Sequence, residues 1–582
     1  MNLQTLNDIF FSIAGRDQHE LMLQLVGETW QPVSSQQFVS KVGGVVAALQ
    51  SWGISRGDRI SILGENRHEW VVADFACFLI GAVAVPIYTT LTAEQTAHML
   101  RDSGARAIFV STDRHLEKVF SVLESTAVEK VVVMDDVTDG RALRMSELMS
   151  VPAEVDLISL GREVQPSDLA TIIYTSGTTG VPKGVMLTHG NMTANITAFC
   201  RDFGFSLGMR CISFLPLSHV TARAVDLGLL NRGVTLAHLP QLEKLPQALR
   251  KVRPDILLGV PRVYEKVHSQ VDLQASKFPK KQIYRWSLKV GRAHRKEVLA
   301  GRTPTSPSWK LAHRLVYSKI SAGVGGRVSI FISGGAPLGR QLAEWYADIG
   351  IRIYEGYGLT ETSPVIAVNV AGAHRVGSVG KPLANVQVRV ADDGEILVGA
   401  PSVFQGYWNM PEETKAAFVD GWFKTGDIGR LDEDGYLYVT DRKKDLLKTS
   451  GGKFVAPQPI ENALKHNPLV AEAVVVGDKR KFPAVLIFPN FPALESRAKE
   501  KALPFTSRHE LIELAAVRAR YAEIVAEVNQ QLAQFEKLKE FRLVAEELSA
   551  SGGTLTASLK LRRRAIEEQF RNKIEEMYAE PN

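Results

Sequence analysis

The stretch Tyr174-Thr-Ser-Gly-Thr-Thr-Gly-Val-Pro-Lys-Gly184 follows the apolar run 168–174, which predicts a β-strand. Its glycines let backbone N–H groups point into a concave anion site, and its hydroxyls add further hydrogen-bond donors. Lys183 adds a positive charge, but it is preceded by proline and followed by glycine, so the stretch is not a Walker A loop. The pattern predicts a phosphate-binding loop between a strand and a helix that begins near Thr188.

The composition is that of an ordinary globular protein and excludes disordered, fibrous and collagen-like chains. The 582 residues are 45% hydrophobic and 23% charged. An odd count of three cysteines suits a reducing compartment. The N-terminus has no basic, apolar leader, and the most apolar stretch, 73–88, is too short for a membrane span and predicts a buried helix followed by a strand. We therefore expect a cytoplasmic protein, with peripheral contact at the inner membrane face left open.

Positive charge is concentrated in residues 250–327, which hold eighteen Lys and Arg against four acidic residues, a net charge of +14 in a chain of +6. Within this segment, residues 280–299 place Ile283, Trp286 and Val290 at helical spacing. One interpretation is a solvated helix face. The other is a surface for anionic lipid or a polyphosphate ligand. Nucleic acid is disfavoured, because no nucleic-acid-binding motif accompanies the charge.

The pattern along the chain predicts an α/β protein with a large N-terminal domain of α/β subdomains, a β-rich subdomain and a small α+β C-terminal domain. Residues 1–165 alternate helical patterns with short apolar runs, and shorter strands with Asp-Gly turns begin after about residue 376. The charged segment 441–446 then precedes the final region. We expect domains at 1–440 and 447–582, joined by a hinge at 441–446. Further strands are expected at 211–215, 234–239, 256–260 and 328–333.

Together with the loop at 174–184, six later segments resemble, in order, the motifs of the AMP-forming adenylating superfamily of acyl-CoA synthetases, luciferases and peptide-synthetase adenylation domains. They are Ser333-Gly-Gly-Ala-Pro337, Gly356-Tyr-Gly-Leu-Thr-Glu-Thr362, Thr425-Gly-Asp-Ile428, Asp441-Arg-Lys-Lys-Asp-Leu446, Thr449-Ser-Gly-Gly-Lys453 and Leu559-Lys-Leu-Arg-Arg563. The sequences of residues 449–461 and 215–220 resemble long-chain and bubblegum-type fatty acyl-CoA synthetases most closely. The resemblance implies the acyl-CoA synthetase/luciferase-like fold, in which the C-terminal domain moves between two reaction steps.

The resemblance also implies an ATP site and a Mg²⁺ site. The implied ATP-binding residues are Thr175, Ser176, Gly177, Thr178, Thr179, Gly180, Lys183, Gly334, Gly335, Ala336, Tyr357, Gly358, Asp427 and Arg442. Glu361 matches the Mg²⁺ ligand, with Thr178 as its hydroxyl partner, and oxygen ligands near phosphates are what Mg²⁺ requires. Thr360 is expected to donate to the α-phosphate. Asp427 is expected to accept both ribose hydroxyls, because a carboxylate is acceptor-only.

The remaining roles concern the second domain and the acyl group. Lys560 matches the lysine that stabilises charge between the carboxylate and the α-phosphate, although the family's usual Pro-Thr is replaced here by Ala557-Ser558. Lys444 takes the hinge position. Gly451, Gly452 and Lys453 are expected to line the CoA channel. His219 resembles the residue near the acyl carbonyl, whereas Arg223 stands where some long-chain enzymes have a gating tryptophan.

The resemblance predicts a long-chain fatty acid–CoA ligase. Fatty acid and MgATP would give acyl-AMP and pyrophosphate, and CoA would then give acyl-CoA and AMP. Two alternatives stay open: a fatty acyl-AMP ligase that loads a carrier protein, and a non-catalytic nucleotide-binding scaffold. Luciferase-type oxygenation is a remote further option. A scaffold would not need Lys183, Glu361, Asp427, Arg442 and Lys560 together.

Overall fold

The computed structural model describes residues 3–137, 139–152, 155–175, 182–450, 453–549, 552–555 and 561–579. An eight-stranded sheet lies in the N-terminal half, with a parallel centre and antiparallel β9 and β19 at one end. Its order is β19 (Gly406–Tyr407), β9 (Lys183–Thr188), β8 (Leu169–Thr175), β4 (Val83–Ile87), β3 (Arg59–Leu63), β5 (Ala107–Val110), β6 (Lys130–Val133) and β7 (Leu143–Arg144).

A nine-stranded sheet forms the second half of the large N-terminal region. Its central strands are parallel, and its edge strands pair antiparallel. The order is β16 (Lys381–Pro382), β15 (Val365–Val368), β14 (Ile353–Gly358), β13 (Ile330–Ser333), β12 (Ile256–Gly259), β10 (Arg210–Ser213), β11 (Thr235–His238), β1 (Met22–Val26) and β2 (Thr29–Val33).

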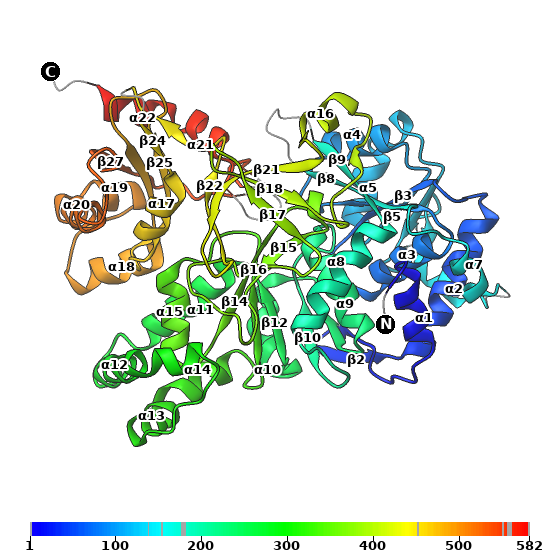
Figure 1. Cartoon of the computed structure of the whole chain (residues 1–582), viewed down its shortest axis with the longest axis horizontal. Helices are drawn as coiled ribbons and strands as arrows, with labels where there is room; N and C mark the ends of the chain where they lie inside the picture. Colours follow the sequence, from blue (N-terminus) through cyan, green and yellow to red (C-terminus); the bar gives the residue numbers. More distant parts are fainter. Residues whose placement is uncertain are drawn as a thin grey trace.

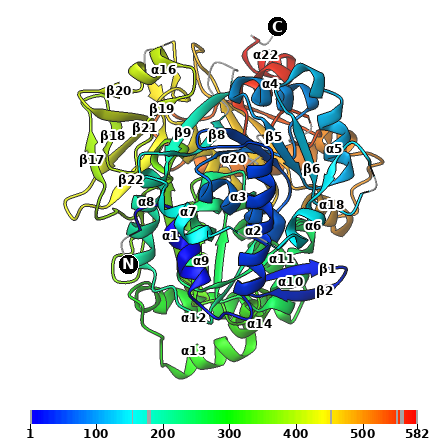
Figure 2. The same ribbon diagram turned by 90° about the vertical axis from the view of Figure 1, so that its right-hand side faces the viewer.

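One apolar core joins these two sheets through the helices between them. It contains side chains of both sheets and of α1 (Asn7–Ala14), α2 (Ser35–Ser51), α3 (His68–Leu79), α8 (His189–Asp202) and α9 (Val220–Asn231). Figure 2 shows α1 and α2 of this set on the side that faces the viewer. The core also encloses the Arg223 guanidinium, which makes a two-pronged ion pair with Asp74 and donates to the Thr171 hydroxyl at 2.7 Å. The buried charges are therefore paired, as burial requires.

A helical lobe projects from the nine-stranded sheet (Figure 1, lower left). It consists of α11 (Pro261–Gln274), α12 (Lys280–Leu299), α13 (Pro307–Ala312), the π-helical segment η3 (His313–Tyr317) and α14 (Ser318–Gly323). Its inner side chains share a core with α15 (Arg340–Asp348) and α10 (Leu245–Val252). The helix expected over 280–299 is confirmed, residue for residue, by α12.

A small antiparallel sheet leads to the C-terminal part. It comprises β17 (Gln387–Val390), β18 (Glu395–Gly399), β20 (Phe418–Val419), β21 (Trp422–Leu431) and β22 (Leu437–Arg442). The C-terminal part has the sheet β25 (Val470–Val476), β26 (Ala484–Pro489) and β27 (Glu540–Leu543), and the hairpin β23 (Leu447–Lys448) and β24 (Phe454–Val455). Its helices include α17 (Pro457–Lys465), α18 (Phe491–Glu500), α20 (Ala515–Asn529), α21 (Arg563–Gln569) and α22 (Arg571–Tyr578).

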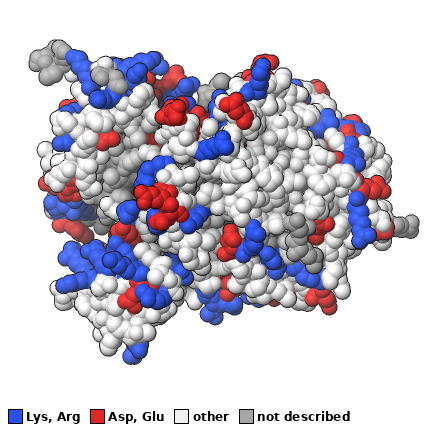
Figure 3. All heavy atoms as spheres, in the orientation of Figure 1, with Lys and Arg blue, Asp and Glu red and all other residues white. Residues whose placement is uncertain are grey.

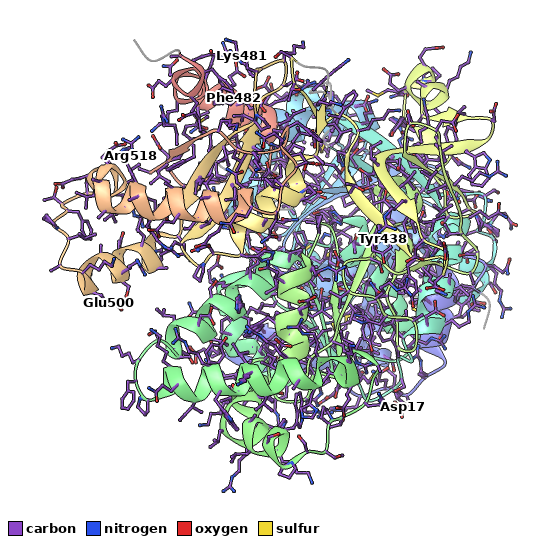
Figure 4. The ribbon with its side chains drawn as sticks, turned by 60° about the vertical axis from the view of Figure 1, so that its left-hand side comes forward. Asp17, Tyr438, Lys481, Phe482, Glu500 and Arg518 are labelled. Carbon is purple, nitrogen blue, oxygen red and sulfur yellow. The ribbon has the colours of Figure 1, made fainter. Side chains whose placement is uncertain are left out.

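The C-terminal part lies beside the helical lobe. Figure 4 shows its orange helices, with Glu500 and Arg518 labelled, above the green helices of the lobe. Arg262 of α11 approaches Glu472 of β25 at 3.6 Å, which joins the two regions by a charged contact. Within the described residues, none of the helices combines the length and the apolarity that a membrane crossing requires.

The strands expected at 211–215, 234–239, 256–260 and 328–333 are confirmed by β10, β11, β12 and β13, with ends shifted by at most two residues. The helix expected near Thr188 is also confirmed. Thr188 is its N-cap, and a reciprocal pair of hydrogen bonds with Asn191 forms a capping box. Strand β9 was not predicted. Lys183 is its first residue and pairs with Thr175, the last residue of β8.

Candidate active site

The ends of β13 and β14 form a glycine-lined slot at the carboxyl edge of the nine-stranded sheet. The two strands are parallel neighbours, so the segments that follow Ser333 and Gly356 leave the same edge, where α/β sheets bind ligands. Gly335 and Ala336 are exposed, and Gly335 has φ 81°, a conformation that favours glycine. The backbone of this slot can therefore approach a flat ring closely.

Gly358 and Glu355 fix the shape of the slot. A Cβ at Gly358 would lie 1.8 Å from the carbonyl oxygen of Pro364, so only glycine fits at this position. The Glu355 carboxylate accepts a hydrogen bond from the Leu338 N–H at 2.9 Å, which ties the segment after β13 to strand β14. Burial raises the pKa of Glu355 to about 7. The predicted residues thus lie side by side: Gly334, Gly335 and Ala336 follow β13, and Tyr357 and Gly358 end the neighbouring strand β14.

Asp427 holds two partners at the end of this slot. Its Oδ2 accepts from the Tyr357 hydroxyl at 2.7 Å, and its Oδ1 lies 3.0 Å from Nε of Arg442. Strand β21 carries Asp427 directly opposite Arg442 on β22, so sheet register brings the two charges together. The Tyr357 pKa is raised well above its ordinary value by burial and by the Asp427 charge, which keeps the phenol a donor.

The turn before Asp427 is held by its own polar groups. The Thr425 hydroxyl donates to the Ile396 carbonyl at 2.8 Å, and the Gly426 N–H donates to the Glu395 carboxylate at 3.0 Å. Gly426 has φ 70°, which suits glycine. The Asp427 side chain is only 4% exposed, whereas Arg442 is 45% exposed. The carboxylate is therefore fixed, and the guanidinium retains an open side.

Glu361 lies close enough for its ionisation to respond to Asp427 and Arg442. It belongs to the 3₁₀ turn η4 (Thr360–Thr362), and its Oε1 accepts from the Tyr407 hydroxyl at 2.9 Å. Burial raises the pKa of Glu361, and the hydrogen bond from Tyr407 opposes that rise. An oxygen donor held in this way suits Mg²⁺, so the residues present fit the metal. Its predicted partner Thr178 lies outside the described residues.

Tyr407 also connects Glu361 to Lys183, at the end of the predicted phosphate loop. The Lys183 ammonium lies 5.0 Å from the centre of the Tyr407 ring, within cation–π range. Strand β19 carries Tyr407 and pairs antiparallel with β9, which begins at Lys183. Thr175 and Lys183 are paired where β8 and β9 meet, at the two ends of the predicted loop. Of that loop, Ser176, Gly177, Thr178, Thr179 and Gly180 lie outside the described residues.

Tyr407 was not predicted from the sequence, and its neighbour Trp408 was not either. Tyr407 lies on a two-residue strand, which is too short to give a period. The Trp408 N–H donates to the Gly184 carbonyl at 2.7 Å, and its indole donates to the Asp102 carbonyl at 2.9 Å. The only sequence signal was the Gly-Tyr-Trp triplet at 406–408. Its meaning depends on the pairing of β19 with the distant strand β9, which the sequence alone does not reveal.

The predicted hinge segment follows Arg442. The Asp441 carboxylate accepts from the N–H groups of Arg442 and Gln458, at 2.7 and 3.1 Å, and burial raises its pKa to about 6. Lys443 binds Asp393 and Glu395 at 2.6 and 2.7 Å.

Lys444 is exposed next to this anchored lysine. Its pKa is lowered, first by partial desolvation and then by the charge of Arg442. The segment 441–444 thus runs from the candidate nucleotide site into the C-terminal part. The hinge role of Lys444 stays a prediction.

The predicted CoA and catalytic residues are only partly described. Lys453 is exposed in the β23–β24 hairpin, and its carbonyl accepts from the Thr449 N–H at 2.9 Å. Gly451, Gly452 and Lys560 lie outside the described residues. Arg563, three residues after Lys560, pairs with Glu461 at 2.7 Å, and Arg564 lies close enough to Lys444 to lower its pKa. The chain next to Lys560 therefore runs beside the hinge segment.

The roles expected of Thr360 at the α-phosphate and of His219 near the acyl carbonyl stay predictions. Thr360 is half-buried at the start of η4, next to Glu361, and its carbonyl accepts from the Ser363 N–H. His219 is the N-cap of α9, where its Nδ1 accepts from the Thr221 N–H at 3.2 Å. Arg223 is one turn further along α9 and is buried against Asp74, so it takes part in the core.

Comparison with known proteins accounts for nearly the whole chain. The model described as AMP-binding enzyme matches residues 14–408, and the model of the AMP-binding enzyme C-terminal domain matches residues 444–582. The long-chain-fatty-acid–CoA ligase FadD15 of Mycobacterium bovis is 36% identical, with 95% of this chain and 94% of the relative covered. The long-chain-fatty-acid–CoA ligase ACSBG2 of Xenopus laevis is 30% identical, with 95% and 80% covered.

Solved structures support the same fold. The anthranilate CoA ligase AuaEII in complex with anthranoyl-AMP superposes with a TM-score of 0.76 at 19% identity, covering 99% of both chains. The A domain of the carboxylic acid reductase from Segniliparus rugosus, in complex with AMP, also gives 0.76 at 20% identity, covering 99% of this chain and 94% of its own. The two family models, together with relatives above 30% identity over nearly the full length, place the protein: the chain belongs to the family of AMP-binding enzymes.

Proposed function

We propose that the protein is an AMP-forming long-chain fatty acid–CoA ligase. The observation that carries the proposal is the 36% identity to a long-chain-fatty-acid–CoA ligase over 95% of this chain. The clustering of Asp427, Tyr357 and Arg442 beside Glu361 supports it, because a nucleotide site needs this combination of groups. The cosubstrates are ATP and CoA.

The reaction solves a chemical difficulty in two steps. A carboxylate is a poor electrophile, because its charge repels nucleophiles and oxide is a poor leaving group. In the first step the fatty acid carboxylate attacks the α-phosphorus of ATP, and pyrophosphate leaves with the bonding electrons. In the second step the CoA sulfur attacks the acyl carbon, its proton is lost, and AMP leaves.

The described residues supply binding and orientation for the first step. We propose that Asp427 accepts the ribose hydroxyls while Tyr357 and Arg442 hold the carboxylate in place. Lys183 supplies positive charge to the β- and γ-phosphates from the end of its loop. Glu361 would hold Mg²⁺, which neutralises phosphate charge when bound. This assignment rests on the 2.7 Å and 3.0 Å contacts of Asp427 and on the cation–π contact of Lys183.

We propose three further roles from sequence alone. Lys560 stabilises the negative charge that develops between the carboxylate and the α-phosphate, Thr360 donates to the α-phosphate, and His219 lies near the acyl carbonyl. The domains 1–440 and 447–582 turn about the hinge 441–446 between the steps. Gly451, Gly452 and Lys453 then line the path of CoA.

We also propose that residues 250–327 contact an anionic membrane at its inner face, where a long-chain fatty acid resides. The net charge of +14 in this segment supports the contact.

The test of the proposed reaction is AMP release across fatty acids of graded chain length, with and without CoA. With a long-chain acid, a ligase of this kind should release AMP when CoA is present and not when CoA is absent. Acyl-CoA should appear in an amount equal to the AMP. Acyl-AMP that accumulates with CoA and transfers only to a carrier protein would identify an acyl-AMP ligase instead. Binding of ATP without any turnover would identify a scaffold.

A further inference from the structure

The helical lobe of residues 261–323, named here the basic lobe, carries an unusual combination of charge and exposed apolar side chains. It holds fourteen Lys and Arg against three acidic residues. All fourteen except Arg295 are exposed. Figure 3 shows the basic side chains gathered at the lower left, over the region of α12. This charge has no role in the proposed adenylation site.

The acidic residues of the basic lobe do not neutralise its outer surface. Asp272 accepts from the Tyr284 hydroxyl at 2.6 Å, and Glu297 lies 2.8 Å from His294. Glu265 is largely enclosed beside Lys465 of the C-terminal part, and burial raises its pKa. Each acidic side chain of the basic lobe therefore already has a neighbouring partner. The positive electrostatic potential of the exposed Lys and Arg is not neutralised by these acidic groups.

Few of the cations are paired. Among the described residues, the Arg and Lys salt bridges of the basic lobe involve only Arg262, Arg292 and Arg295. The lysines at 277, 280 and 281 form no salt bridge within that part of the chain. Lys277 lies in the connection between α11 and α12, and Lys280 and Lys281 begin α12. A surface so charged attracts a polyanion.

Apolar side chains are exposed on the same lobe. Among the described residues sixteen large apolar side chains are exposed, and six of these lie in the basic lobe: Leu273, Phe278, Ile283, Trp286, Leu311 and Leu315. Phe278 is 78% exposed, more than any other of the sixteen. It stands between Lys277 and Lys280. A polyphosphate offers this ring no apolar contact, whereas a bilayer surface takes an aromatic ring and neighbouring cations together.

We propose that residues 275–281, the α11–α12 connection and the first two residues of α12, are the point at which the basic lobe enters an anionic lipid bilayer, with Phe278 inserted among the acyl chains and Lys277, Lys280 and Lys281 at the phosphates. This inference deepens the proposed membrane contact and rests on it. The exposed face of α12, with Trp286 and Lys289, extends the contact along the surface. The partner is a phosphate-bearing lipid headgroup in a bilayer.

The first experiment measures binding of the full chain to phosphatidylcholine vesicles with and without phosphatidylglycerol, in the absence of substrates. Binding should require phosphatidylglycerol and weaken as salt rises. The triple variant Lys277→Gln/Lys280→Gln/Lys281→Gln should bind about 100-fold more weakly, about fivefold for each lysine. Phe278→Ala should lose about tenfold. The matched controls are Lys499→Gln/Lys501→Gln/Lys539→Gln and Phe535→Ala, at exposed positions of the C-terminal part.

The second experiment locates the insertion. The three native cysteines are buried and their pKa values are raised, so an introduced cysteine can be labelled selectively. A polarity-sensitive dye on Ser276→Cys should shift to the blue on anionic vesicles, and the same dye on Ala127→Cys, an exposed control, should not.

Several outcomes would overturn the inference. They are equal binding to neutral vesicles, equal loss in the matched controls, or an unshifted dye at position 276. Binding to duplex DNA as tight as that to anionic vesicles would make the basic lobe a general polyanion surface and would equally overturn it. The vesicle and dye experiments contain no substrate, so a negative result in them says nothing about the proposed reaction. That reaction is tested separately, by the release of AMP with soluble shorter acids.

Discussion

Replacing Tyr407 with Phe isolates one hydrogen bond of the candidate active site. The Tyr407 hydroxyl donates to Oε1 of Glu361 at 2.9 Å, and the ring lies 5.0 Å from the Lys183 ammonium. Phenylalanine keeps the ring, so the contact with Lys183 persists. Only the donor to the carboxylate is lost.

The size of the effect follows from the two influences on Glu361. Burial raises its pKa, and the hydroxyl lowers it. A hydrogen bond to a charged group contributes about 1.5–3 kcal/mol. One pKa unit corresponds to about 1.4 kcal/mol, so Tyr407→Phe should raise the pKa of Glu361 by about one to two units. A carboxylate binds Mg²⁺ in its ionised form, so the acid limb of the pH profile should move upward by a similar amount.

The assay is pyrophosphate release as a function of pH, at limiting and at saturating Mg²⁺. The shift should be clear at limiting Mg²⁺ and shrink at saturation, because the metal competes with the proton. Unfolding by urea over the same pH range gives a readout without turnover. The folded pKa of Glu361 is raised, so its contribution to stability is present below the unfolded pKa and is lost as pH rises through the folded pKa. In the variant that loss should extend to higher pH.

The matched control is Tyr521→Phe, which removes a buried hydroxyl that donates to the Leu469 carbonyl at 2.6 Å, within the C-terminal part. It should leave the acid limb in place. An acid limb that does not move in Tyr407→Phe at limiting Mg²⁺, or that moves equally in the control, would refute the reasoning.

Four further changes test other parts of the molecule. Asp427→Asn should weaken ATP binding, measured by calorimetry, by about 1.5–3 kcal/mol, because an amide cannot replace an acceptor-only carboxylate; unchanged affinity would contradict the ribose role. Lys560→Ala should slow acyl-AMP formation by about 10²–10³ yet leave conversion of supplied acyl-adenylate with CoA intact, and equal loss in both half-reactions of a folded variant would reject the division of roles. Arg223→Ala should lower the free energy of unfolding in urea by about 3–5 kcal/mol, because Asp74 would stay buried without its partner; a loss below about 1 kcal/mol would count against a tight pair. Asp441, whose pKa is raised to about 6, contributes stability that is present below about pH 4 and is lost as pH rises through about 6. In urea unfolding, Asp441→Asn should lack this loss of about 3 kcal/mol. A pH dependence of stability that is the same in the variant and in the unchanged protein would contradict this role of Asp441.

Much of the fold could be predicted from local pattern. Residues 280–299 show a helical period that the structure confirms, and the run 168–174 predicted β8 to within one residue. The stretch 73–88 was correctly interpreted as a helix followed by a strand, α3 and β4. Short-range periodicity was enough in each case, because one face or one whole element had to be buried.

Other features depend on pairing between distant residues, which a single sequence does not reveal. Strand β9 was missed because the residues after Lys183 gain their strand conformation from β8 and β19. Tyr407 was missed because it reaches Glu361 only through that pairing. Asp427 and Arg442 were predicted separately, but their 3.0 Å contact follows from the register of β21 and β22.

Strand β22 has a consequence for the energetics of the enzyme. It carries Arg442 against the candidate nucleotide carboxylate, and two residues later it becomes the connection to the C-terminal part. If the C-terminal part turns at the proposed hinge 441–446, a nucleotide that favours one position of Arg442 would also favour one angle between the two parts of the chain. Linkage is reciprocal, so that angle must change the affinity for the nucleotide by the same factor. Release of AMP and reorientation of the C-terminal part would then be two measurements of a single coupling free energy.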